Sequence, residues 1–161
     1  MDMRTRSGAS RAPMGLVIFL ILMLAGCASG PAPIPSKGSI AASADVNPNP
    51  EGRPSPIVLR VFELRTADAF RNADFFSLYR DSKKVLGQDL LGQQEFELHP
   101  GETRDFKQQL PVGTRFVGVV AAFRDLDRAS WRALAAVPAK SKVALQIRLS
   151  RLSVSVSAGK Q

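Results

Sequence analysis

IVLRVFEL, the stretch from Ile57 to Leu64, combines β-branched, aliphatic and aromatic side chains in a way that favours a β-strand. Its first residues are apolar on both faces, which is typical of a strand in the middle of a sheet. A second stretch, RFVGVVAAFR from Arg115 to Arg124, is equally apolar and predicts another central strand. Central strands need neighbours on both sides, so we expect the chain to build an extensive β-structure.

Weaker strand patterns flank these two stretches. Thr103 to Leu110 is polar enough for an edge strand, and residues 143–149 and 152–156 alternate apolar and polar side chains in opposite phases. The change of phase at Ser150-Arg151 predicts either a bulge in one long strand or a tight corner. Seven or eight short strands separated by turns are typical of an antiparallel β-sandwich. The sequence therefore predicts a mainly β domain over residues 39–157.

Residues 66–92 interrupt the strand patterns with a helical one. Asn72 is expected to cap a helix that begins at Ala73-Asp74. Apolar side chains then recur at helical spacing, at Phe75, Phe76, Leu78 and Tyr79. Such a stripe more often packs against a core than binds a ligand. Gly87 is expected to end the helical part, which we interpret as a small insertion covering one edge or end of the sheet.

The N-terminal residues have the organisation of a secretory signal. Three arginines precede an apolar run from Leu16 to Leu24, which is much shorter than the ~20 residues that a membrane-spanning helix needs. The run ends at Leu24, Ala25, Gly26 and Cys27, and Cys27 is the only cysteine. This arrangement resembles the lipobox of bacterial lipoproteins, in which the cysteine is acylated and becomes the N-terminus. The alternatives are an ordinary signal peptide or a short buried segment.

The position of the lipobox predicts how the chain is divided into segments. Residues 1–26 would be the signal peptide, residues 27–38 the lipidated Cys27 with a proline-rich tether, and residues 158–161 a C-terminal tail. Ala28 follows the cysteine, where an aspartate would favour the inner membrane, so lipoprotein sorting implies outer-membrane lipid and a domain facing the periplasm. Lasting residence needs two or more acyl chains, because a single chain binds a membrane only marginally.

The composition argues against nucleic acid as a partner. The net charge is +8, but the basic residues are interspersed with acids, as in Arg60, Glu63 and Arg65. A scattered pattern is typical of a solvated surface with some attraction to a membrane or a protein partner.

No catalytic pattern is recognisable. His99 is the only histidine and precedes a proline in an expected turn. Asp125 and Asp127 could join a calcium site, but two acids at this spacing without further ligands fit a hydrogen-bonded turn better. We therefore expect no enzyme activity, no cofactor, no metal and no small-molecule substrate.

Several segments taken in order resemble the TssJ family, the outer-membrane lipoproteins of the bacterial type VI secretion system. They are Asn47-Pro48 with residues 52–57, residues 73–78 (ADFFSL), 85–87 (VLG), 98–102 (LHPGE) and 123–132 (FRDLDRASWR). The resemblance implies a transthyretin-like β-sandwich with an added helical element. It also implies binding to the periplasmic C-terminal domain of the inner-membrane protein TssM and, through TssM, a complex with TssL.

In that family the loop between the first two strands contacts TssM. The matching loop here consists of Asn47, Pro48, Asn49, Pro50, Glu51, Gly52, Arg53, Pro54, Ser55 and Pro56. Its prolines reduce the entropy lost on binding, and Arg53 offers a planar donor for carboxylates or carbonyls. Two alternatives remain: a rigid connection without a contact role, and a periplasm-facing lipoprotein binding or assembly module of unrelated purpose.

Overall fold

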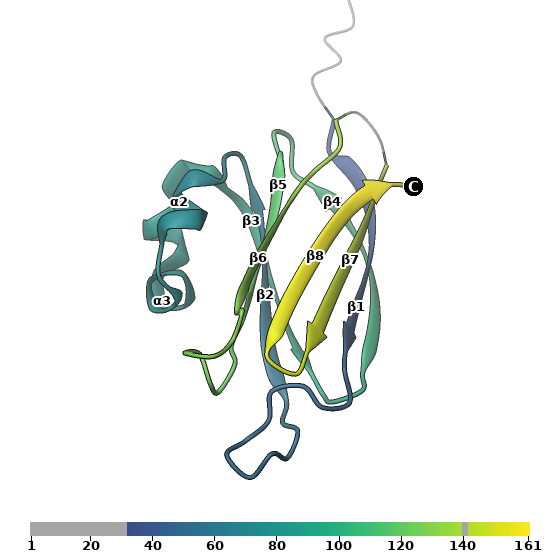
Figure 1. Cartoon of the computed structure of the whole chain (residues 1–161). Coiled ribbons are helices and arrows are strands. Elements are labelled where there is room, and N and C mark those ends of the chain that lie inside the picture. The colour runs from purple at the N-terminus through teal and green to yellow at the C-terminus, as the bar shows by residue number, and fades with distance from the viewer. Residues whose placement is uncertain (1–31, 140–141) are drawn as a thin grey trace, which may run out of the picture. The chain divides into compact units, whose positions relative to one another are not determined.

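The computed structural model describes residues 32–139 and 142–161, which form a sandwich of two four-stranded sheets with helices on one outer face (Figure 1). One sheet has the strand order β4-β1-β7-β8 and the other the order β3-β2-β5-β6. The strands are β1 (Ile34–Ala42), β2 (Ile57–Leu64), β3 (Leu90–Leu98), β4 (Thr103–Leu110), β5 (Phe116–Ala121), β6 (Arg132–Ala136), β7 (Val143–Ser150) and β8 (Ser153–Lys160). This confirms the predicted mainly β sandwich.

The strand positions follow from the apolar content of each segment. β2 and β5 lie in the middle of their sheet, and β4 is an edge strand, as their sequences predict. β7 and β8 are separate antiparallel strands joined at Arg151-Leu152, so the change of phase marks a tight corner rather than a bulge. Neighbouring strands pair antiparallel except β1 and β7, which run parallel.

The first strand begins earlier than the sequence indicates. β1 starts at Ile34, so residues 34–38, which we expected in the tether, are paired with β4 and, from Ser36 on, with β7. Pro35 is tolerated because it lies at the start of the strand, before the parallel pairing begins. At the other terminus β8 extends to Lys160, so residues 158–160 belong to the sheet and not to a free tail. Both boundary predictions were wrong for these residues.

The main core fills the space between the sheets. It contains the inward-facing residues of β1, β2, β5 and β7, for example Ile40, Leu59, Val119 and Ile147, each 1% exposed or less. Glu63 is an exception, because it is 3% exposed and accepts a hydrogen bond from Gln94 Nε2 at 3.4 Å. Burial raises the pKa of Glu63, and the hydrogen bond from Gln94 opposes that rise only in part.

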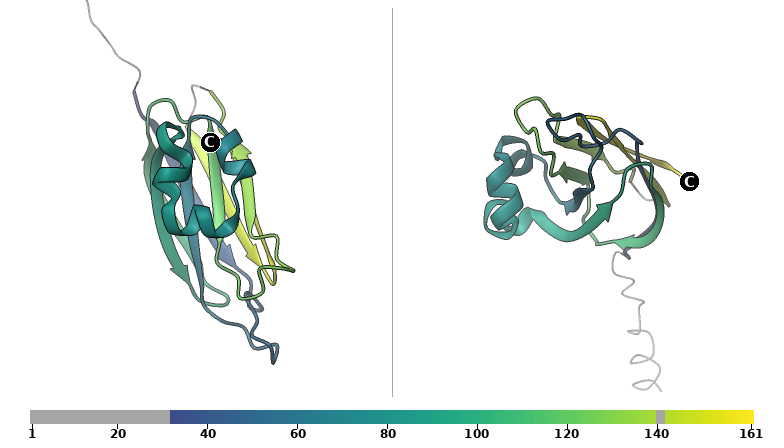
Figure 2. Two further views of the ribbon diagram at one scale, coloured as in Figure 1. Left: turned by 90° about the vertical axis from the view of Figure 1, so that its left-hand side faces the viewer. Right: turned by 90° about the horizontal axis from the view of Figure 1, so that it is seen from below.

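A second, smaller core lies between the outer face of the β3-β2-β5-β6 sheet and the helices α2 (Asp68–Asn72) and α3 (Phe75–Leu86) (Figure 2). The ring of Phe70 in α2 covers Gly118 of β5, where an added Cβ would lie 2.7 Å from Phe70 Cζ. Arg132 Nη1 donates hydrogen bonds to the carbonyl oxygens of Phe70 at 2.9 Å and Ala73 at 2.8 Å. The helices are therefore fixed to the sheet by both packing and hydrogen bonds.

The helical insertion is present, but its cap differs from the prediction. Asp74, not Asn72, caps α3: its side chain accepts a hydrogen bond from the backbone N–H of Ser77 at 3.0 Å. Asn72 is instead the last residue of α2, because a separate short helix precedes the chain reversal at Ala73. Gly87, at φ 50°, ends α3 as expected, and a short 3-10 helix, η1 (Gly87–Asp89), leads into β3.

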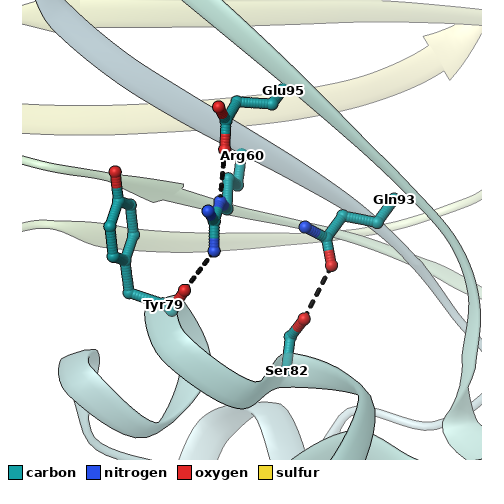
Figure 3. A network of polar contacts seen from close by, with 5 residues as sticks. All are labelled: Arg60, Tyr79, Ser82, Gln93 and Glu95. Atoms are coloured by element: carbon teal, nitrogen blue, oxygen red, sulfur yellow. Dashed lines mark hydrogen bonds and ion pairs between the residues drawn. The ribbon is translucent and has the colours of Figure 1, made fainter.

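The middle of α3 is kinked at Asp81 (φ −143°) and is supported from the sheet (Figure 3). Arg60 of β2 donates to the carbonyl oxygen of Tyr79, forms an ion pair with Glu95 of β3 at 2.6 Å, and lies 4.1 Å from the centre of the Tyr79 ring. Ser82 donates to Gln93 at 2.7 Å beside it. These contacts compensate the helix hydrogen bonding that is interrupted at the kink.

Candidate functional site

The loop between β1 and β2 lies at the end of the sandwich opposite to the start of β1 (Figure 1). It includes the ten residues, Asn47 to Pro56, that the sequence analysis selected. Pro50, Glu51, Gly52, Arg53, Pro54 and Pro56 are exposed, and Pro48 and Asn49 are half-buried. The segment is therefore available for contact along most of its length.

Asn47 and Ser55, two of the ten residues, hold the base of the loop in place and are buried. Asn47 is 2% exposed, with φ 49°, and its Nδ2 donates to the carbonyl oxygen of Pro56 at 2.8 Å. Its Oδ1 accepts a hydrogen bond from the backbone N–H of Arg124 at 2.8 Å. Ser55 is also buried, and its N–H donates to the carbonyl oxygen of Val46 at 3.1 Å. Asn47 and Ser55 are thus buried and close the base of the loop, while the other eight residues are half-buried or exposed.

The tip of the loop is a tight turn. The Asn49 N–H donates to the Arg53 carbonyl oxygen at 2.9 Å, and the Arg53 N–H donates to Asn49 Oδ1 at 2.8 Å. Gly52 has φ 79°, a conformation that favours glycine. The Arg53 side chain is 78% exposed, and its only ion pair in the described part of the chain is with Glu51 at 3.9 Å. At that separation and exposure, Arg53 is available to another partner.

The loop forms one wall of a groove of about 730 Å³. The other walls come from the connection between β5 and β6, from the turn between β7 and β8, and from the first turn of α3. Besides the loop, the groove is lined by Phe76, Arg124, Asp125, Leu126, Asp127, Arg128, Arg151 and Leu152. Arg53 lies on the loop but does not line the groove.

Phe76 is the one aromatic side chain that lines this groove, although its place in the helical stripe predicted a core position. Its side chain is 55% exposed, whereas Phe75 and Leu78 are buried. Phe75 and Phe76 are adjacent, so one helix face cannot bury both of them. The Phe76 ring is held by an edge-on contact with Phe75, at 5.4 Å between ring centres, and by Arg80 at 5.2 Å.

Asp125, the first of the two acids in the β5–β6 connection, stabilises a turn. Asp125 Oδ1 accepts a hydrogen bond from the backbone N–H of Arg128 at 3.3 Å, and Oδ2 pairs with the Arg128 guanidinium. This hydrogen bonding, assisted by charge, holds the pKa of Asp125 below its usual value. His99 is exposed in the β3–β4 turn, where its backbone N–H donates to Glu102 Oε2 at 2.8 Å.

Within residues 32–139 and 142–161, no three His, Cys, Asp or Glu side chains come together as metal ligands would. In the same part of the chain, no helix has the length and apolar character to cross a membrane. What the described residues offer at this end is a preformed groove whose walls carry apolar, basic and acidic side chains.

The model of a family described as "Type VI secretion lipoprotein, VasD, EvfM, TssJ" matches residues 36–152. The chain belongs to this TssJ family. No curated protein matches the chain. The description of this family confirms the prediction, made from the sequence, of a type VI secretion lipoprotein.

Solved structures agree with the TssJ assignment. The T6SS lipoprotein TssJ1 from Pseudomonas aeruginosa is 38% identical, with a TM-score of 0.76 over 80% of this chain and 98% of that chain. Lip from Serratia marcescens, a membrane bound component of the Type VI Secretion System, is 31% identical, with a TM-score of 0.69 over 76% and 96%. A chain of a structure described as "Type VI membrane complex" is 23% identical, with a TM-score of 0.66 over 75% and 95%, which supports the fold alone.

The predicted site residues of this TssJ-family chain form two groups, the lipobox and the loop between β1 and β2. Leu24, Ala25, Gly26 and Cys27 lie outside the described residues. The loop lies between β1 and β2, as the resemblance implied, but no sequence pattern indicated the groove beside it. Its walls come from segments far apart in the chain, and only the adjacency of Phe75 and Phe76 signalled that one aromatic side chain would be left exposed.

Proposed function

We propose that this TssJ-family protein is a lipid-anchored outer-membrane component of the type VI secretion trans-envelope complex. It binds the periplasmic C-terminal domain of TssM and, through TssM, is linked to TssL. The observation that carries the TssM contact is the groove beside the loop from Asn47 to Pro56. Acylated Cys27 supplies the membrane attachment.

The chemistry of the groove suits a protein partner. Phe76 is an exposed aromatic anchor, and such residues in a pocket commonly dominate the binding energy of an interface. Arg124 and Arg151 beside it are exposed guanidinium groups, which match carboxylates or backbone carbonyls of a partner. Because Asn47 and Ser55 fasten the loop in the free protein, little conformational entropy remains to be lost on binding.

The position of the groove suits a bridge between two membranes. The chain enters the sandwich at Ile34, at one end, and the loop lies at the other end (Figure 1). The groove is at that end too, because the loop lines it. With Cys27 held in the outer membrane, a protein that extends from the inner membrane would meet the groove first. In this role the protein acts by binding alone, without catalysis, a cofactor or a small-molecule substrate.

A direct binding measurement tests the TssM contact. The acylated protein, held in detergent or vesicles, is titrated with the periplasmic C-terminal domain of the TssM from the same organism. We expect saturable binding that is lost when Phe76 is replaced by aspartate, because a charge would then replace the exposed aromatic side chain of the groove. Val112→Asp, measured in detergent, where no lipid surface is present, is the matched control, since Val112 is also exposed but lies outside the groove. Binding that Phe76→Asp leaves unchanged would contradict this contact surface.

Replacement of Cys27 by serine tests the anchor. We expect the variant to remain unacylated and to leave the outer-membrane fraction, because the remaining N-terminal apolar run is too short for a spanning helix. Membrane fractionation with metabolic labelling by a fatty acid measures both properties. A variant that still fractionates with the outer membrane would show that attachment does not depend on this cysteine.

A further inference from the structure

Three lysines gather on the outer face of the β4-β1-β7-β8 sheet, in the half of that sheet nearer to the start of β1. Lys37 of β1, Lys107 of β4 and Lys142 before β7 line one groove of about 330 Å³, together with Pro35 and neighbouring polar residues. All three lysines are exposed. This groove lies at the opposite end of the molecule from the groove that contains Phe76, because Pro35 and Lys142 lie at the starts of β1 and β7.

The arrangement of these lysines does not stabilise the folded protein. Lys37 and Lys107 lie directly opposite each other in the antiparallel β1–β4 pair, and like charges in that position destabilise a sheet. Within the described residues, none of the three lysines has an acidic side chain within 4.0 Å. Asp105, the acid on the same face of β4, is two residues further from this end. Asp105 lines a neighbouring groove with Lys37 and Lys107, so the three lysines leave a net positive patch, which is suited to an external anionic surface.

An apolar side chain is exposed at the same end. Val112 lies in the turn that follows β4 and is 41% exposed. The turn is closed by hydrogen bonds from the N–H and hydroxyl groups of Thr114 to the carbonyl oxygen of Pro111, at 3.1 and 2.7 Å. Since Ile34 pairs with Leu110, the turn directly adjoins the point where the chain enters the sandwich.

The distance to the acylated cysteine is short. Because β1 starts at Ile34, only the six residues 28–33 separate it from Cys27. Even when fully extended, this segment reaches about 25 Å. The end of the sandwich that carries Lys37, Lys107, Lys142 and Val112, which we call the lysine end, is therefore held near any membrane that contains the acyl chains.

We propose that the lysine end docks on the anionic lipid headgroups of the membrane in which Cys27 is anchored, with Val112 at the headgroup boundary. This inference rests on the lipid anchor of the proposed function and adds a second, electrostatic contact. Docking orients the sandwich so that the groove with Phe76 points away from the membrane. The anchor alone would leave that orientation free.

The electrostatic contribution is large enough to measure. A basic residue close to an anionic membrane surface favours binding by about fivefold. Replacing all three lysines by glutamine removes this attraction and should therefore reduce the ratio of docked to undocked protein on the order of 100-fold. Glutamate at the same positions should give a larger reduction, because it also adds repulsion.

The experiment measures the depth of a fluorescent label at position 112. When Cys27 is acylated, a cysteine introduced by Val112→Cys is the only free thiol, so an environment-sensitive dye attaches there alone. The acylated protein is reconstituted into vesicles of phosphatidylcholine mixed with phosphatidylglycerol, and quenching by spin-labelled lipid is recorded. We expect strong quenching, which decreases at high salt concentration, in pure phosphatidylcholine and in the triple lysine variants.

Two matched controls accompany it. A dye at Pro50→Cys, in the loop at the opposite end, should remain unquenched. Replacement of Arg124, Arg148 and Arg151 by glutamate changes the net charge equally and should leave the quenching at position 112 intact. Protein that floats with the vesicles but shows equal quenching at both dye positions would overturn the docking alone. Protein that does not float would contradict the lipid anchor, and with it this proposal.

Discussion

Replacing Asn47 by alanine is expected to lower the free energy of unfolding by about 3 kcal/mol and to weaken TssM binding by about 10- to 100-fold. The substitution removes the partners of the Arg124 N–H and the Pro56 carbonyl, which Asn47 satisfies at 2.8 Å each. It also places alanine at φ 49°, where a Cβ is unfavourable. Denaturant unfolding and titration with the TssM domain measure the two effects.

Two variants separate the causes. Asn47→Gly relieves the backbone strain but not the loss of hydrogen bonds, so it should recover about 1 kcal/mol of stability and little of the binding. Asn49→Ala removes only an exposed hydrogen bond, to the Arg53 N–H, and should change stability by less than about 0.5 kcal/mol. If Asn47→Ala left TssM binding intact, the conformation of this loop would not matter to the contact.

The parts of the fold that could be predicted are those in which one segment determines its own surroundings. Ile57–Leu64 and Phe116–Ala121 are apolar on both faces, so only the middle of a sheet can accommodate them. The start of β1 could not be predicted in the same way, because its proline and glycine weaken the local strand signal. Its strand structure depends on pairing with β4 and β7, and β7 lies more than a hundred residues away in the chain.

The candidate site was less predictable than the fold for a related reason. The proline-rich loop can be recognised from its own residues. The anchoring role of Asn47 cannot, because it depends on a hydrogen bond from Arg124, which lies 77 residues further along the chain. Phe76 matched a core pattern, and its exposure depends on which face of α3 meets the sheet. A groove assembled from the ends of several elements has no continuous sequence signature.

The second large effect concerns the attachment of the helices that position Phe76. Replacing Gly118 by valine is expected to destabilise the protein by about 3 kcal/mol, because the new side chain would occupy the position of the Phe70 ring. An added Cβ alone would lie 2.7 Å from Phe70 Cζ. Phe70 must then move away from the sheet, and α2 with it. Thermal and denaturant unfolding measure the loss.

This displacement should extend to TssM binding. Arg132 holds the carbonyl oxygens of both Phe70 and Ala73, and α3 begins only two residues after Ala73. Movement of α2 would therefore shift Phe76 in the groove and lower the affinity about tenfold, a cost typical of an interface residue that loses its position.

A matched substitution shows whether the close contact is the cause. Gly159→Val makes the same change in β8, where nothing lies within 4 Å of an added Cβ, and should alter stability by less than about 0.5 kcal/mol. Combining Gly118→Val with Phe70→Leu should recover part of the stability, because the smaller side chain leaves room for valine. If Gly118→Val were as mild as Gly159→Val, the helices would not depend on the Phe70–Gly118 contact, and the position of Phe76 would have to be fixed from α3 alone.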